Sequence, residues 1–207
     1  MTKQVEGIDQ IYCINLDRRL DRWQKMNEQF KKLNMKVEKF SAIDGKSAFN
    51  ENSYRSGVYG CFASHVNVLE DAVRRNFSSI IVIEDDAMLH PNFQDIVEKS
   101  LTFLPNEWKL CYLGGSNMKP PKKLHKNISI CTETLSTVGY MINVSFAREI
   151  LIPRLKKLLG TIEIDSELTK AQRDFTFYIL DPRVIYQFED YSDIQHKSVN
   201  YLHQKDF

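Results

Sequence analysis

The sequence predicts an α/β fold in which a mostly parallel central sheet is flanked by helices. Strand-like apolar runs alternate with longer segments of helical period through the first 115 residues, a pattern typical of β-α-β units. The chain has 207 residues, of which 43% are apolar and 11% aromatic, enough for a substantial core. No internal repeat and no linker rich in glycine or serine divides it, so we expect a single domain over residues 1–207.

The first half supplies most of the alternation. The run "QIYCINL" is β-branched and apolar, as in a buried strand, and the next segment repeats large apolar residues at helical spacing, with Asp17 as a possible cap. The segment before "SHVNVLEDAV" has no clean period and is expected to be a loop. The predicted strands are 10–16, 36–45, 80–83 and 110–115, the helices 17–34, 64–77 and 92–105, and the loop 46–60.

The second half is less regular. Lysines and prolines in "NMKPPKKLHKN" predict a basic loop, and a helix is expected to be interrupted or bounded at Pro153. A short acidic helix start lies within 162–174. The remaining predictions are the loop 117–127, strands 136–143, 175–180 and 183–188, and the helix 145–159.

Composition excludes several classes of protein. With 28 basic and 27 acidic residues the net charge is +1, which argues for neither nucleic acid nor a membrane surface as partner. No apolar run approaches the roughly 20 residues that span a bilayer. The polar start "MTKQVEGIDQ" lacks the apolar centre of a signal peptide, so we expect a cytoplasmic protein with free thiols. The sequence indicates no oligomeric state.

Polar or glycine-rich segments follow four of the predicted strands. They are "NLDRR", "AIDG", "EDD" and "LGG". Ligands of open α/β sheets bind beyond the carboxyl ends of the strands. We therefore expect these four segments to face one cleft.

Three consecutive carboxylates, Glu84, Asp85 and Asp86, end the strand "IIVI". They repel one another wherever water is partly excluded, so a divalent cation, an arginine or exposure to solvent should offset the repulsion. Glu84 and Asp86 point the same way in an extended strand end, and oxygen ligands suit Mg²⁺ or Mn²⁺. A solvated acidic turn is the alternative.

The segment "INLDRRLDRW" carries the complementary charge at the start of a helix. Arg18, Arg19 and Arg22 could bind phosphate there, since helix N-termini and guanidinium groups both favour it. Ion pairs with Asp17 and Asp21 on a solvated helix are an equally good interpretation.

Other catalytic signatures are weak or absent. The sequence contains neither GxGxxG nor GxxxxGK[ST], which excludes a dinucleotide fingerprint and a P-loop. No CxxC spacing and no Ser-His-Asp or Cys-His set can be assembled. His65 is placed at a loop-to-helix junction, where a structural role is more common than a functional one.

Several segments together resemble glycosyltransferase family 25. In order they are "YCINLDRRLDRW", "FSAIDGK", "YGCFASHVNVLEDAV", "IIVIEDDAML", "LCYLGGS", "STVGYMINVSFAREIL", "EIDSEL" and "PRVIYQFEDYSDI". They extend from about residue 9 to about residue 195. The family includes bacterial lipooligosaccharide galactosyltransferases and the collagen hydroxylysine galactosyltransferase domain.

The resemblance implies a GT-A type nucleotide-sugar-binding fold and a glycosyltransferase activity. It implies inverting transfer from a UDP-sugar, usually UDP-galactose, to a hydroxyl of a saccharide or of a hydroxylysine-bearing protein. It also implies Mn²⁺, or Mg²⁺, held by a DxD-like acidic motif. Family members serve lipooligosaccharide biosynthesis or collagen glycosylation, and both acceptor classes stay open.

The resemblance also assigns residues to roles. Asp86 would bind the metal directly with Glu84 and a C-terminal histidine, His196 or else His203, while Glu84 and Asp85 would serve the ribose or a metal-bound water. Asp165 would be the base or would orient the acceptor, with Glu167 beside it; a helix cap is the alternative for Asp165. The remaining donor-binding candidates are Asn15, Leu16, Asp17, Arg18, Arg22, Asp44, His65 and Gly114.

Two other functions compete with this one. The first is a catalytically silent sugar- or protein-binding module on the same fold. The second is a sugar-phosphate nucleotidyltransferase, which needs a glycine-rich triphosphate loop near the N-terminus. The segment "INLDRRLDR" has no glycine, so the second function is disfavoured.

Overall fold

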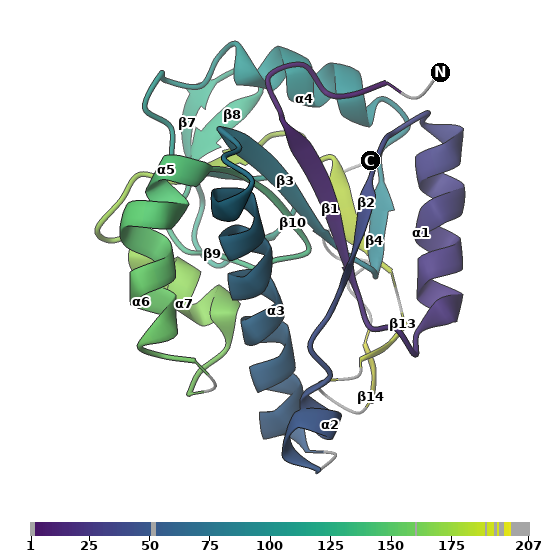
Figure 1. Ribbon diagram of the computed structural model, residues 1–207. Coiled ribbons are helices and arrows are strands. Elements are labelled where there is room, and N and C mark those ends of the chain that lie inside the picture. The colour runs from purple at the N-terminus through teal and green to yellow at the C-terminus, as the bar shows by residue number, and fades with distance from the viewer. Residues whose placement is uncertain are drawn as a thin grey trace.

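The protein is a three-layer α/β/α structure in a computed structural model that describes residues 3–50, 53–159, 161–188, 190–192, 194 and 197–199. An eight-stranded sheet forms the middle layer, with α1 (Leu20–Lys32) and α4 (Phe93–Leu101) on one face and α3 (Tyr54–Arg74) and α5–α7 on the other (Figure 1). The predicted fold class is confirmed.

The sheet has the order β2-β1-β3-β10-β5-β11-β8-β7. Strands β2, β1 and β3 pair in parallel, and β10 lies antiparallel between β3 and β5. The pairings make β10 and β8 the two strands that run against the others. The strands are β1 (Gln10–Asn15), β2 (Glu38–Ser41), β3 (Ser79–Glu84), β5 (Leu110–Tyr112), β7 (Lys122–His125), β8 (Ile128–Ile130), β10 (Gly139–Asn143) and β11 (Tyr178–Leu180).

Alternation along the central strands builds a core on each face of the sheet. In β3, Ile80 and Val82 pack toward α3 and α5–α7, whereas Ile81 and Ile83 pack toward α1 and α4. All four side chains are fully buried. Because both faces are covered, the strand is continuously apolar from Ile80 to Ile83, and Glu84 follows where the strand leaves the layers.

The smaller elements complete the two ends of the sheet. Strand β12 pairs with β4, β13 with β14 and β6 with β9. Pro153 lies in the first turn of α6, directly after a π-helical turn, η1, so the predicted interruption is confirmed. Their bounds are α2 (Gly45–Phe49), β4 (Ala87–Leu89), β6 (Ser116–Asn117), β9 (Thr134–Leu135), α5 (Val144–Phe146), η1 (Ala147–Leu151), α6 (Ile152–Lys156), α7 (Ile164–Ala171), β12 (Ile185–Gln187), β13 (Asp190–Ser192) and β14 (Lys197–Val199).

Four local predictions were wrong. Most of the expected loop 46–60 is helical: α2 covers Gly45–Phe49, and α3 begins after Ser53, whose capping box has Ser56 as its other member. His65 therefore lies within α3, not at its start. The expected loop 117–127 contains the edge strand β7, and Asp17 does not cap α1, whose N-cap residue is Arg19.

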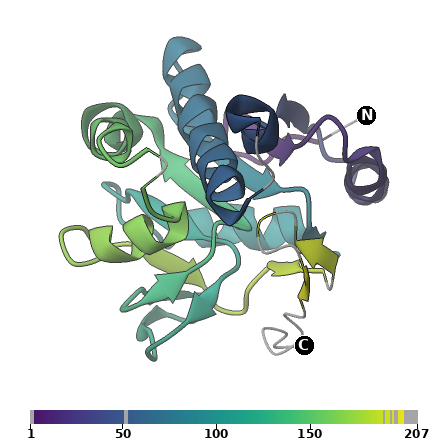
Figure 2. The same ribbon diagram turned by 90° about the horizontal axis from the view of Figure 1, so that it is seen from below.

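Close packing of two glycines fixes the α2–α3 corner below the sheet. A Cβ atom on Gly60 would lie 2.6 Å from the carbonyl oxygen of Ile43, and one on Gly45 would lie 1.7 Å from that of Ser56. Only glycine allows α2 to approach α3 so closely. The corner thereby comes to lie at the carboxyl ends of β1, β2 and β3, as the view from below shows (Figure 2).

Candidate active site

A pocket opens at the carboxyl ends of β1, β2 and β3. Its walls come from the segments after these strands, from α2 and the N-terminal turns of α3, and from Ile194 near the C-terminus. The lining residues are Ile14, Leu16, Arg18, Arg22, Ala42, Ile43, Asp44, Gly45, Lys46, Ser53, Ser56, Gly57, Gly60, Cys61, Ser64, His65, Glu84, Asp85, Asp86 and Ile194.

The carboxylate of Asp85 is buried and bound by two side chains of the protein. Its carboxylate accepts hydrogen bonds from Arg22 Nη1 at 2.8 Å and from Asn15 Nδ2 at 2.7 Å. Burial raises the pKa of Asp85, although both partners favour its charged form. Asp85 thus joins β3 to β1 and α1. Its carboxylate oxygens are occupied by these partners, which suits a structural role better than the predicted contact with ribose or a metal-bound water.

Glu84 belongs to a chain of hydrogen bonds that ends inside the core. Its Oε1 atom lies 3.1 Å from His65 Nε2 and accepts a 2.5 Å hydrogen bond from the Thr137 hydroxyl. His65 Nδ1 in turn lies 3.0 Å from the hydroxyl of Tyr140. Burial acts to raise the pKa of Glu84, but these hydrogen bonds outweigh it and the pKa is lowered. Glu84 is therefore an ionised, oriented carboxylate.

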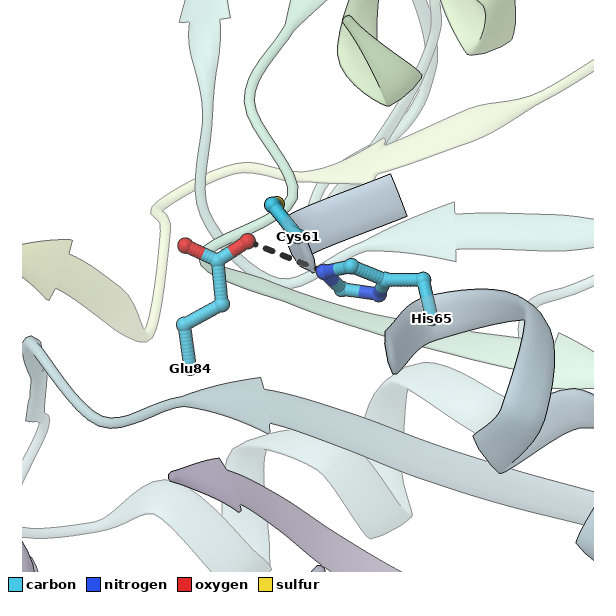
Figure 3. A group of neighbouring side chains, drawn as sticks. All are labelled: Cys61, His65 and Glu84. Atoms are coloured by element: carbon cyan, nitrogen blue, oxygen red, sulfur yellow. Dashed lines mark hydrogen bonds and ion pairs between the residues drawn. The ribbon is translucent and has the colours of Figure 1, made fainter. Parts of the chain in front are cut away.

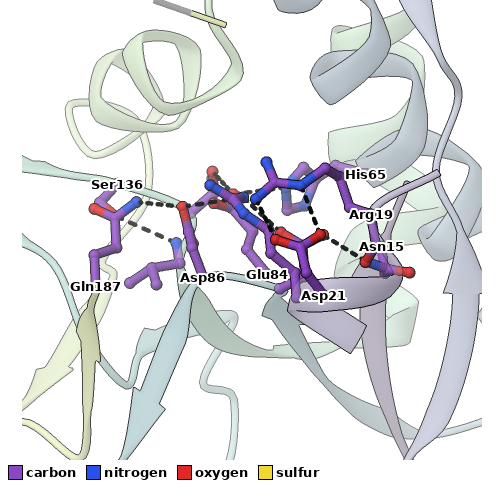
Figure 4. A network of polar contacts seen from close by, with 12 residues as sticks. Asn15, Arg19, Asp21, His65, Glu84, Asp86, Ser136 and Gln187 are labelled. Atoms are coloured by element: carbon purple, nitrogen blue, oxygen red, sulfur yellow. Dashed lines mark hydrogen bonds and ion pairs between the residues drawn. The ribbon is translucent and has the colours of Figure 1, made fainter. Parts of the chain in front are cut away.

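Asp86 has the opposite environment. Within the described part of the chain its Oδ1 atom is buried without a hydrogen-bond partner, and its Oδ2 atom lies 3.5 Å from Gln187 Nε2 and 3.7 Å from Arg22 Nη1 (Figure 4). Burial, followed by the charge of Glu84, raises the pKa of Asp86 to about 7. A buried carboxylate oxygen without a partner, next to a second carboxylate, is a set of hard donors that a divalent cation would satisfy. The residues present therefore fit such an ion.

The arginines after β1 have separate partners. Arg22 faces Asp85, Arg19 pairs with Asp21 at 2.9 Å, and Arg18 Nε lies 3.1 Å from Asp44 Oδ2 at the pocket wall. Asp17 is not part of the pocket lining, and its carboxylate accepts hydrogen bonds from Lys39 and Ser41. Among the three arginines, Arg18 is 45% exposed at the side chain and borders the pocket, so it is the best placed of them to meet an anionic ligand.

Asp165 lies near the acidic end of the pocket. Its carboxylate accepts from the backbone N–H of Ser166 at 2.7 Å and from that of Ser136. Burial and the nearby charge of Glu84 raise its pKa. It stands in the first turn of α7, one residue inside the helix, so it acts there as a helix-start acceptor without being the N-cap.

Glu167 is engaged elsewhere. Its side chain is 4% exposed and its Oε1 atom accepts a 2.5 Å hydrogen bond from Arg154 Nε. It fastens α7 to α6, and this position does not suit the catalytic role that was predicted for it.

The structure brings most of the predicted site residues together. Leu16, Arg18, Arg22, Asp44, His65 and the three acids line one pocket. Asn15 does not line the pocket but donates a hydrogen bond to Asp85, which does. Gly114 packs against β12, where a Cβ atom would lie 2.2 Å from the Ile185 carbonyl oxygen. His196 and His203 lie outside the described residues. Sequence reasoning missed Thr137 and the α2–α3 corner; the spacing Ser53–Ser56 was the one available signal for that helix start.

The architecture and the pocket define a nucleotide-sugar-type α/β fold. The protein is similar to the crystal structure of a glycosyltransferase involved in the glycosylation of the major capsid of PBCV-1, with a TM-score of 0.57, 6% sequence identity, and coverage of 90% of this chain and 95% of that one. At so low an identity the similarity shows the fold. Among the described residues no helix is long and apolar enough to cross a membrane.

The sequence profile of glycosyltransferase family 25 (LPS biosynthesis protein) matches residues 8–168, and the chain belongs to this family. It is 28% identical to a glycosyltransferase 25 family member of Drosophila melanogaster over 76% of this chain and 30% of the relative. It is 27% identical to procollagen galactosyltransferase 2 of Homo sapiens over 70% and 28%. It is 24% identical to the human inactive glycosyltransferase 25 family member 3 over 76% and 31%. The chain thus spans about a third of the length of these relatives.

Proposed function

We propose that residues 1–207 form one domain that transfers a sugar, galactose in the first instance, from a UDP-sugar to a hydroxyl of a saccharide or of a hydroxylysine-bearing protein. The observation that carries this proposal is the buried Asp86 Oδ1 atom in a pocket bordered by Glu84 and Arg18. Carboxylates and a cationic side chain together suit a nucleoside diphosphate with its counter-ion, and family membership supports the choice.

The two ends of the pocket suit the two parts of the donor. Leu16, Ala42 and Ile43 form an apolar wall between the β1 and β2 ends, which suits a flat base. Positive charge and backbone N–H groups lie on another part of the pocket lining, where a diphosphate would bind. They come from Arg18, Lys46 and the N-terminus of α3.

Asp86, with Glu84 beside it, would hold Mn²⁺ or Mg²⁺. The ion would neutralise the negative charge that develops on the leaving diphosphate. His65 and Thr137 keep Glu84 ionised and fixed, so its carboxylate needs little reorganisation when a ligand binds. His196 stays a candidate third ligand, as the family resemblance implies.

Asp165 is the proposed base. An inverting displacement needs a group that removes the proton of the acceptor hydroxyl on the face opposite the leaving group. Burial and the charge of Glu84 raise the pKa of Asp165 toward neutral pH. The Asp165 carboxylate is therefore a better proton acceptor than an exposed aspartate. Two backbone N–H groups keep the side chain in place.

A binding module without catalysis is the second candidate, favoured by one observation: a relative that covers 76% of this chain is named inactive. A thermal-shift screen of nucleotide sugars with and without Mn²⁺ separates the two when it is followed by a UDP-release assay. We expect stabilisation by UDP-galactose that requires Mn²⁺, and release of UDP. Stabilisation without any release would favour the binding module, and no shift with any nucleotide would refute the proposed donor.

A further inference from the structure

A thiol, an imidazole and a carboxylate meet on the wall of the pocket. The Sγ atom of Cys61, one ring nitrogen of His65 and one carboxylate oxygen of Glu84 all lie within 4.8 Å of one another (Figure 3). Cys61 and His65 are four residues apart in α3 and so project from the same face of the helix. Glu84 reaches them from the end of β3.

The spacing is close to that of a tetrahedral zinc site. Zinc–nitrogen and zinc–oxygen bonds of about 2.0 Å place these ligand atoms about 3.3 Å apart, and a zinc–sulfur bond of about 2.3 Å gives about 3.6 Å for the sulfur–nitrogen pair. His65 Nε2 and Glu84 Oε1 already lie 3.1 Å apart. The cysteine needs to move by no more than about an ångström to complete the geometry, an adjustment within side-chain freedom.

The surroundings of His65 match those of a metal-bound histidine. Such histidines bind the metal through one ring nitrogen and are oriented by a hydrogen bond at the other. His65 Nδ1 lies 3.0 Å from the Tyr140 hydroxyl, deep in the core, so Nε2 is aimed at Cys61 and Glu84. The imidazole is 1% exposed and therefore has little freedom to turn away.

We propose that Cys61, His65 and Glu84 form a zinc-binding site with its fourth position open to the pocket. Binding replaces the hydrogen bond between His65 and Glu84 with bonds to the ion. The imidazole proton moves from Nε2 to Nδ1, which then donates to the Tyr140 hydroxyl oxygen, and the thiol proton of Cys61 leaves to solvent. Thiolate and imidazole select Zn²⁺ over Mn²⁺ and Mg²⁺, which prefer oxygen ligands. This site differs from the one at Asp86 in its sulfur donor and in its histidine, and it shares only Glu84 with it.

Sharing Glu84 gives the site a consequence, which rests on the proposed function. A zinc ion held by Cys61, His65 and Glu84 would occupy a Glu84 oxygen and neutralise the carboxylate that the ion at Asp86 needs, so zinc is expected to inhibit the Mn²⁺-dependent reaction. Zinc binding itself needs neither a donor nor turnover. A protein that binds zinc without transferring sugar would refute only the proposed function, and one that transfers sugar without binding zinc would refute only the zinc site.

Cobalt substitution tests the site on the full chain without any nucleotide. Co²⁺ added to the reduced protein should give a thiolate-to-cobalt charge-transfer band that saturates at one equivalent and is abolished by Zn²⁺. Cys61→Ser should remove the band and Cys131→Ser should keep it, since Cys131 is a buried cysteine outside the group. No band in the unsubstituted protein, or an unchanged band in Cys61→Ser, would overturn the proposal.

A second measurement does not depend on the variants folding. X-ray absorption of the zinc complex of the unsubstituted protein should show one sulfur scatterer at about 2.3 Å beside nitrogen and oxygen. A first shell of nitrogen and oxygen alone would exclude Cys61 and contradict the site.

Discussion

Asp86→Asn should change the pH dependence of stability when divalent cations are removed. Burial and the charge of Glu84 raise the pKa of Asp86 to about 7 in the folded protein, against about 3.9 in an unfolded chain. The folded state thus keeps a proton that the unfolded state releases between about pH 4 and pH 7. The free energy of unfolding of the unsubstituted protein therefore falls as pH rises through this window, and three pKa units correspond to about 4 kcal/mol.

The variant lacks this penalty, so its stability relative to the unsubstituted protein should rise with pH. Urea denaturation in EDTA at intervals from pH 4 to pH 8 measures the difference. We expect a gain of up to about 4 kcal/mol between the two ends, with most of the change complete by pH 7. Asp95→Asn is the control, because that side chain is 78% exposed and its replacement should give no slope. A difference for Asp86→Asn that stays constant with pH would refute the reasoning.

Three further outcomes follow. Asp85→Asn removes the charge that faces the buried Arg22, which should cost about 3 kcal/mol, or roughly 6–12 °C in Tm, and a loss below about 1 kcal/mol would contradict the structural role. Gly60→Ala forces a methyl group against the Ile43 carbonyl and should lower Tm and weaken nucleotide binding in a titration; unchanged values would show that the α2–α3 corner adjusts freely. Tyr140→Phe removes the hydrogen bond to His65 and should lower the free energy of unfolding by about 1 kcal/mol in urea denaturation. An unchanged denaturation midpoint would show that this hydrogen bond does not stabilise the fold.

The central strands could be predicted from sequence because burial on both faces leaves a continuous apolar run. The segment Ile80–Ile83 shows this pattern, and the position of Glu84 at its end located the pocket correctly. The helix start at Ser53 was missed, since Gly57 and Gly60 interrupt the helical pattern of its first turns, and Gly60 is required there by the close approach of α2. The local capping box at Ser53 and the packing of Gly60 against α2 together stabilise that helix start.

The partners of the three acids could not be read from the sequence. Adjacent carboxylates look alike there, and it takes the pairing of β1 with β3 to bring Asn15 beside Asp85. Likewise, His65 reaches Glu84 because α3 crosses the sheet next to the end of β3. The sequence therefore predicted an acidic cluster. The difference between Asp85, held by two partners, and Asp86, with a buried oxygen that has none among the described residues, depends on contacts between distant segments.

The most direct test is UDP release from UDP-galactose by the unsubstituted protein and by Asp86→Asn, each with Mn²⁺ and with EDTA. We predict release by the unsubstituted protein with Mn²⁺ and none in EDTA. The variant should lose at least the roughly 100-fold that removal of an outer-shell partner of a metal ligand can cost. Asp95→Asn should retain full activity. Equal release by Asp86→Asn and the unsubstituted protein would contradict the assignment of this pocket as the metal-dependent transfer site.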